Sequence, residues 1–205
     1  MIELAELSNY FFLTYVAIYI LTHFPFDIYM LIKKNKASYP TPNFRSTLEG
    51  LLVVLPTFLF WFYLLFSPIV VLSSGRNIFV IEQVSDTVKF PIILFGIIIM
   101  SIGLIIGCLG RIGRGAYLAR KEAKLSTTWG HAIVRHPSYF LYITGFIGLS
   151  FAAFSPYLFV LLLGIPGYIM ISKHEEEVLI GKFGEEYKIY MKKVGRLFLK
   201  IRREK

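Results

Sequence analysis

The chain has very little cysteine: Cys108 is the only one among 205 residues. An internal disulfide and a cysteine-based metal cluster are both excluded, because each needs at least two thiols. Basic residues are also lacking near the start, which carries Glu3 and Glu6 instead of the positively charged region of a cleavable signal peptide. We therefore expect the first apolar stretch to remain as a membrane span and Cys108 to serve as a small apolar residue in a helix.

Charged residues are scarce as well. They make up 17% of the chain and hydrophobic residues 56%, whereas about a quarter of the residues of a soluble domain are charged. The net charge of +9 could suit nucleic acid, but the basic residues cluster beside apolar runs, which is typical of contact with lipid headgroups. The composition predicts an integral membrane protein with membrane lipid as a partner and without a nucleic-acid partner.

Three apolar segments, at about 8–32, 46–72 and 88–112, each approach the roughly 20 residues that span a bilayer. A further apolar segment, 138–172, is interrupted by Ser155-Pro156, which predicts two arms of about 16 residues. We interpret it as a short antiparallel helical hairpin, with one long bent span as the alternative. The predicted fold is all-α and polytopic, with five transmembrane helices and a C-terminal interfacial helix within the basic, amphipathic tail 182–205.

Basic residues also predict the orientation of the chain. They follow the first and third spans and fill the tail, whereas the chain begins with acidic residues. Loops rich in lysine and arginine stay in the cytoplasm. Five crossings then place the N-terminus outside and the C-terminus in the cytoplasm.

Ionisable residues bracket the predicted hairpin. Arg135 and His136 precede Pro137, a residue favoured in the first turn of a helix, and Glu175 opens a run of three glutamates after the second arm. Both ends of a hairpin lie on the same side of the membrane, so these groups should meet. A guanidinium beside a helix N-terminus binds anions and the glutamates offer the opposite charge, so the site should suit a ligand that carries both signs. A purely structural Arg–Glu bridge in a non-catalytic membrane protein is the alternative.

At these residues the sequence resembles a known family. The run from Arg135 to Tyr139, the Glu175-Glu176 pair, the run from Phe183 to Tyr187, and Tyr190 and Arg196 are similar to the C-terminal signature of the isoprenylcysteine carboxyl methyltransferases, to which phospholipid methyltransferases are related. The resemblance covers about residues 123–200, and the first three spans are matched only in hydropathy.

The resemblance implies S-adenosylmethionine as the cofactor, bound on the cytoplasmic side. The residues it assigns to cofactor binding are Ala123, Lys124, Leu125, Ser126, His131, His136, Pro137, Ser138, Tyr139 and Glu175. It places Arg135, Glu176 and Arg196 at the catalytic centre, where they would orient the acceptor or brace the pocket. Many relatives have Gly-Pro-Tyr or Gly-Val-Tyr where this chain has Trp129-Gly130-His131. The composition predicts a single membrane domain, with three spans in 1–112 and the hairpin and a cytoplasmic segment in 113–205. The resemblance adds a cofactor-binding loop at the start of the second part.

The expected reaction is methylation of a carboxylate on a prenylcysteine-like or other lipophilic or lipidated acceptor. A phospholipid amine or a small thiol is an alternative acceptor. An NADPH-dependent reductase similar to the membrane sterol reductases is a second alternative, because those enzymes also carry the Arg-His-Pro sequence.

Two further patterns bear on packing and metals. Gly103 and Gly107 form a small-xxx-small pair that favours close helix contact. His23 and Asp27 lie four residues apart on one helical face, but no further ligands stand at a suitable spacing. We therefore predict no metal and expect Asp27 to form an interfacial salt bridge, with Lys33 nearby.

Overall fold

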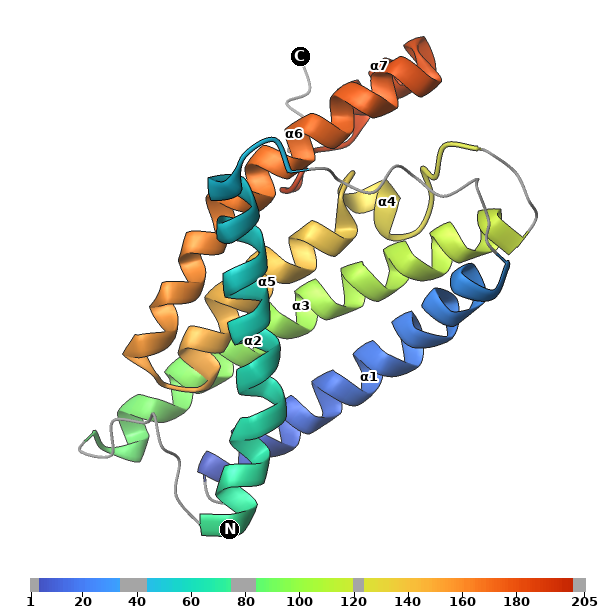
Figure 1. Cartoon of the computed structure of the whole chain (residues 1–205). Helices are drawn as coiled ribbons and strands as arrows, with labels where there is room; N and C mark the ends of the chain where they lie inside the picture. Colours follow the sequence, from blue (N-terminus) through green and yellow to red (C-terminus); the bar gives the residue numbers. More distant parts are fainter. Residues whose placement is uncertain (1–3, 34–43, 75–83, 120–123, 201–205) are drawn as a thin grey trace.

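The structure is a computed structural model that describes residues 4–33, 44–74, 84–119 and 124–200, and within these ranges all the elements are helices (Figure 1). This confirms the predicted all-α class. The helices, in chain order, are α1 (Leu4–Lys33), α2 (Thr47–Ser74), α3 (Asp86–Ala119), α4 (Gly130–Ile133), α5 (Pro137–Ala152), the 3₁₀ helix η1 (Pro156–Leu163), α6 (Gly164–Phe183) and α7 (Glu185–Lys193).

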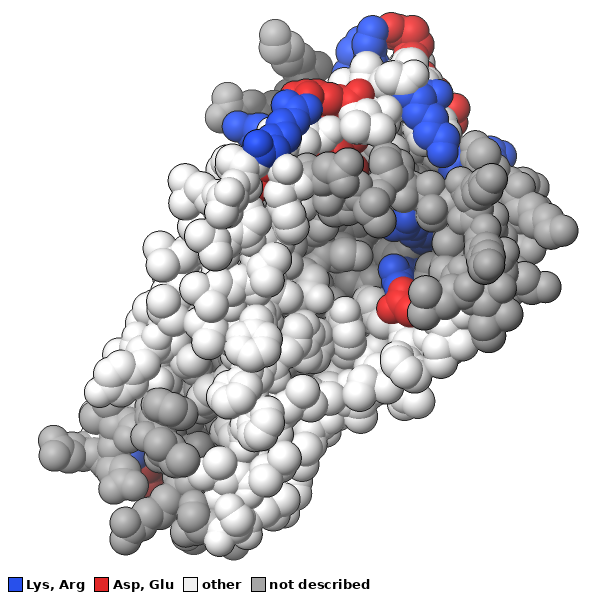
Figure 2. All heavy atoms as spheres, in the orientation of Figure 1, with Lys and Arg blue, Asp and Glu red and all other residues white. Residues whose placement is uncertain are grey.

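Four helical segments are long and apolar enough to cross a membrane: Leu7–Pro25, Thr47–Ser73, Asp86–Arg114 and Pro156–Phe183. A shorter apolar helix, α5, occupies Pro137–Ala152. On the face seen in Figure 2, the charged side chains gather mainly at the end where α6 and α7 lie, and a broad surface below them is uncharged. Several apolar helices and this separation of charge characterise a membrane protein.

The chain breaks where the Ser155-Pro156 pair predicts. Helix α5 ends at Ala152 and η1 begins at Pro156. The two helical segments are unequal, however, because α6 continues past the apolar residues to Phe183. It stops there because Gly184 adopts φ 55°, a left-handed conformation that suits glycine.

Glycines on α3 allow α5 to approach its backbone closely (Figure 1). A methyl group on Gly96 would collide with the backbone of Ala152, and one on Gly107 would lie 2.5 Å from Leu141 Cδ1. Gly103 has as little space, against Thr144. The close helix contact predicted from Gly103 and Gly107 is therefore confirmed, with α5 as the partner of α3.

Helices α1 and α2 touch near the N-terminal end of α1 and then diverge (Figure 1). Tyr19 and Trp61, whose rings lie 4.4 Å apart, mark the contact nearest the charged end. Beyond it, α1 packs on α3, where Asp27 pairs with Arg111. The side chain of Lys33, which was expected near Asp27, lies outside the described residues. Figure 2 shows a hollow in the surface between α1 and α2.

The first half of α2, on the far side of its contact with α1, packs on α6. Thr57 Oγ1 lies 2.8 Å from the hydroxyl of Tyr168. Glu49, which is fully buried, lies 2.9 Å from Nδ1 of His174. These contacts fix the rotation of α6 about its axis, and the next residue along α6 is Glu175.

Candidate functional site

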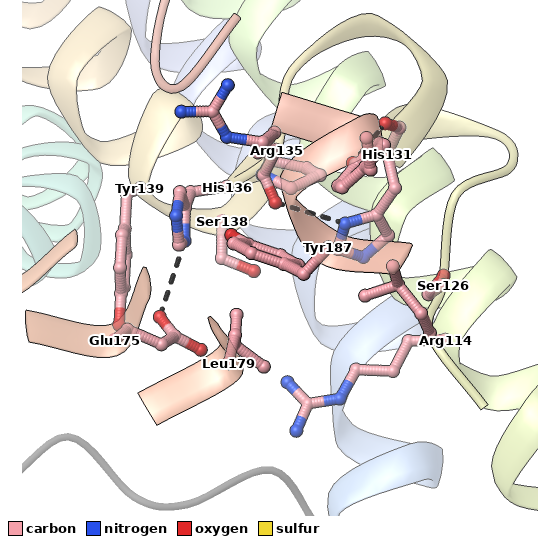
Figure 3. Close-up of a pocket in the computed structure, with 13 residues that line it drawn as sticks. Arg114, Ser126, His131, Arg135, His136, Ser138, Tyr139, Glu175, Leu179 and Tyr187 are labelled. Carbon is pink, nitrogen blue, oxygen red and sulfur yellow. Dashed lines mark hydrogen bonds and ion pairs between the residues drawn. The ribbon is translucent and has the colours of Figure 1, made fainter. Parts of the chain in front are cut away.

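A pocket lies where the loop before α4, the start of α5, the end of α6 and α7 meet (Figure 3). Helix α5 begins at Pro137, which confirms the predicted first-turn position. The lining residues are Arg114, Leu125, Ser126, His131, Arg135, His136, Pro137, Ser138, Tyr139, Glu175, Leu179, Tyr187 and Tyr190. The basic residues before α5 and the glutamates of α6 therefore meet in space, as predicted.

Glu176 is the centre of a buried charge network beside the pocket. Its side chain is 3% exposed. One carboxylate oxygen accepts a hydrogen bond of 2.7 Å from Nε of Arg135. Nε of Arg196 donates to the other oxygen at 2.8 Å. Two guanidinium groups thus enclose one carboxylate, an arrangement that is strong when every donor is used. Arg135 also donates to the carbonyls of Met191 and Val194, so it joins α6 to the segment after α7.

The segment after α7 also pairs with the chain before α5 through the backbone. The amide of Arg135 donates to the carbonyl of Gly195 at 2.8 Å, and the amide of His136 donates to the carbonyl of Arg196 at 3.2 Å. An isolated parallel bridge joins Val134 to Gly195. This part of the tail is thus ordered against the site, after the short helix α7.

His136 and Glu175 face each other across the pocket (Figure 3). Nδ1 of His136 lies 3.3 Å from Oε2 of Glu175, and Nε2 lies 3.4 Å from Glu176. Burial opposes a charge on the imidazole, but these two carboxylates outweigh burial and raise the pKa of His136. The ring of Tyr139 lies parallel to the imidazole, with 5.4 Å between the centroids.

His131 has the opposite electrostatic character. Burial is the main cause that lowers its pKa to about 4. Its Nδ1 lies 3.2 Å from the carbonyl oxygen of Arg135, and its own carbonyl accepts a hydrogen bond of 2.5 Å from the hydroxyl of Tyr190. His131 is therefore a neutral residue of the pocket wall at physiological pH.

Folding stability is expected to fall as the pH is lowered from about 6.5 to 4. In this range the unfolded chain protonates His131 and the folded chain does not, which costs at most about 3 kcal/mol for a pKa lowered to about 4. His136 acts in the other direction, because its raised pKa gives a stabilisation that is complete below about pH 6.5 and is lost as the pH rises through the folded-state value.

Melting temperatures of the detergent-solubilised protein between pH 4 and 8 check this expectation. His131→Asn removes the titrating group and should flatten the acid side of the curve. Parallel curves for the wild-type chain and the variant would show that His131 does not control acid stability.

The structure also places the other residues predicted from the sequence. Ala123 lies outside the described residues, and Lys124 is exposed and does not line the pocket. Leu125 and Ser126 are buried and line it. Glu176 and Arg196 lie behind the wall in the charge network and do not line the pocket, an arrangement that favours bracing over contact with a ligand.

Four lining residues were missed as site residues by the sequence analysis: Arg114, Leu179, Tyr187 and Tyr190. Arg114 was counted among the basic residues that follow a span, and only the course of α3 beyond the predicted end at residue 112 shows that it belongs to the pocket. Tyr187 and Tyr190 stood in the signature without an assigned role. The three-residue spacing between them places both on one face of α7.

The pocket has a volume of about 90 Å³, and a second cavity of about 350 Å³ adjoins it. Leu125 and Tyr190 line both. The hydroxyl of Tyr187 is buried at the pocket and has no hydrogen-bond partner among the described residues. An unpaired buried hydroxyl is costly, so a ligand that accepts or donates a hydrogen bond there would be favoured.

Comparison with models of known protein families gives no match for this chain, and comparison with curated proteins gives none either.

Proposed function

We propose that the protein is an integral membrane methyltransferase that uses S-adenosylmethionine and a lipophilic acceptor. The observation that carries the proposal is the meeting of His136 and Glu175, 3.3 Å apart, in a pocket that Arg114 also lines. The resemblance of residues 123–200 to the isoprenylcysteine carboxyl methyltransferases supports the same assignment. The pocket offers both signs of charge, as an amino-acid moiety with a sulfonium centre requires.

The residues present fit this cofactor. Glu175 would hold its positive centre and Arg114 its carboxylate, while the unpaired hydroxyl of Tyr187 would gain a partner. The pocket of about 90 Å³ is too small for the whole molecule, and the adjoining cavity of about 350 Å³ would accept the nucleoside. When bound, S-adenosylmethionine supplies a methyl group whose C–S bond breaks as the bond to the acceptor forms, with the electron pair passing to sulfur.

The chain's own residues would contribute placement more than acid–base chemistry. A carboxylate acceptor needs no proton removed, and holding the reacting atoms in line at about 3 to 3.5 Å supplies several kcal/mol of the barrier reduction. Glu176, braced by Arg135 and Arg196, keeps the end of α6 against the start of α5. These three residues would therefore act by positioning Glu175 and His136.

The divergence of α1 and α2 supports an acceptor that enters from the bilayer. Above the contact of Tyr19 with Trp61, α1 packs on α3 and α2 packs on α6, and parts of α3 and α5 are seen in the opening between α1 and α2 (Figure 1). Tyr142 and Tyr139 on α5 lead from that contact toward His136 through the ring of Tyr168. An apolar chain lying on these rings would bring its polar end to the pocket.

We further propose five membrane crossings: α1, α2, α3, the short α5, and η1 with α6. Sixteen residues of α5 span only about 24 Å, so the bilayer would thin there or α5 would lie partly below the surface. The basic residues then place the N-terminus outside and the pocket, with α7, on the cytoplasmic side.

Ligand-induced stabilisation tests the function. We expect S-adenosylmethionine and its demethylated product, S-adenosylhomocysteine, to raise the melting temperature of the detergent-solubilised protein, since a ligand at 100 times its Kd stabilises by about 2.7 kcal/mol. NADPH at the same concentration should have no effect. Stabilisation by NADPH alone would favour the reductase alternative. No stabilisation by any of the three ligands would favour the alternative of a non-catalytic protein in which the Arg–Glu network is purely structural.

A further inference from the structure

Gly184 and Trp129 share one unusual backbone conformation. Gly184 has φ 55° and ψ −127°, and Trp129 has φ 55° and ψ −129°. This region is open to glycine and costly for a residue with a Cβ atom. Glycine occupies it before α7, but before α4 the chain places its bulkiest residue there. The side chain of Trp129 must therefore contribute something that glycine cannot.

The position of Trp129 indicates what its side chain contacts. The side chain lies against Gly113 of α3, because a methyl group on that glycine would be 3.1 Å from Trp129 Cβ and 3.2 Å from Cδ1. The apolar segment of α3 that could cross a membrane ends at Arg114, one residue later. The indole is thus held at the end of a span, and 57% of the residue is exposed.

The neighbouring residue, Gly130, fixes the position of Trp129 along α3. Gly130 is buried, and a methyl group on it would lie 2.4 Å from both the amide nitrogen of Gly110 and the carbonyl oxygen of Ile106. The loop is thus pressed against the α3 backbone immediately beside Trp129. It also carries Leu125, Ser126 and His131 into the pocket.

We propose that Trp129 inserts into the lipid headgroup region and anchors the pocket loop, residues 124–133, to the bilayer surface. Tryptophan is favoured at this depth because its ring is amphipathic and its N–H can reach water or a headgroup. The occupant of the surface around Trp129 is lipid of the same membrane, since the residue lies at the end of a span with Arg111 and Arg114 in the same turn of α3. The proposal is independent of the methyltransferase assignment.

Depth-dependent fluorescence quenching tests the anchor. The chain has two tryptophans, Trp61 and Trp129, so Trp61→Phe leaves Trp129 as the only indole. In phosphatidylcholine vesicles that carry bromine at defined acyl positions, we expect the shallowest bromines to quench the fluorescence of Trp129 most. We expect aqueous iodide to quench it at least threefold less than it quenches free tryptophan. The proposal would be overturned by any of three results: iodide quenching as strong as for free tryptophan, no quenching by bromolipid, or strongest quenching at the bilayer centre.

A second comparison covers the case in which Trp61→Phe does not fold. The difference in fluorescence between the wild-type chain and Trp129→Phe isolates the same indole, with Trp61 present in both. Hydrogen exchange of 124–133 in nanodiscs gives an independent measurement: Trp129→Ala keeps the costly backbone conformation without the indole and should exchange at least threefold faster than the wild-type chain. Equal exchange would show that the indole does not hold the loop at the membrane.

Discussion

Replacing Glu175 by glutamine is expected to weaken binding of S-adenosylhomocysteine by about 30-fold or more. Glu175 is the carboxylate that lines the pocket, and it lies 3.3 Å from His136. Losing the charge of a buried, hydrogen-bonded group costs about 2 kcal/mol or more, and each 1.4 kcal/mol is tenfold in affinity. The substitution keeps the shape of the side chain, so the loss would report on charge. Titration calorimetry of the detergent-solubilised protein measures the affinity.

Glu177→Gln provides a matched control on the same helix. Its carboxylate pairs with Arg45 on the surface, and its side chain is 60% exposed. Exposed pairs contribute little, so binding should change less than twofold. Unchanged affinity in Glu175→Gln, together with measurable binding by the wild-type chain, would remove Glu175 from the cofactor site and leave the cofactor assignment intact.

Replacing Glu176 by alanine is expected to lower the melting temperature by roughly 10 °C. The substitution leaves the guanidiniums of Arg135 and Arg196 without their shared carboxylate. Breaking a buried ion pair costs about 3–5 kcal/mol, and 1 kcal/mol corresponds to about 2–4 °C in a chain of this size. The start of α5 and the segment after α7 should loosen together, because Arg135 joins them.

The size of this effect is judged against an exposed pair. Glu185→Ala removes the partner of Lys188, where the side chains are 77% and 51% exposed, and should change the melting temperature by no more than about 2 °C. Equal effects of the two substitutions would show that the network around Glu176 does not stabilise the fold. Differential scanning fluorimetry in one detergent suffices for both.

Much of the fold follows from local sequence patterns. Long apolar runs predict the helices because a membrane-embedded backbone must satisfy its own hydrogen bonds. Pro137 predicts the start of α5 because its ring fits the first helical turn, and Ser155-Pro156 predicts the break before η1. Gly103 and Gly107 predict a close helix contact, although only the structure identifies α5 as the partner.

The remaining parts of the site depend on contacts between distant segments. Nothing in the sequence near Arg114 shows that α3 continues far enough to bring it into the pocket. The pairing of residues 134–136 with 195–196 uses backbone groups, which leave no pattern in the side chains. The left-handed conformation of Trp129 is equally hidden, because a tryptophan gives no turn signal.

The order of translation gives the contact between Arg135 and Gly195 a further meaning. A ribosome adds residue 195 sixty residues after residue 135, so all of α5 and α6 is synthesised while the amides of Arg135 and His136 still lack their final acceptors. Arg196, which pairs with Glu176, is likewise added only after all of α6 and α7. The pocket therefore cannot be completed before the segment that carries Gly195 and Arg196 has been synthesised.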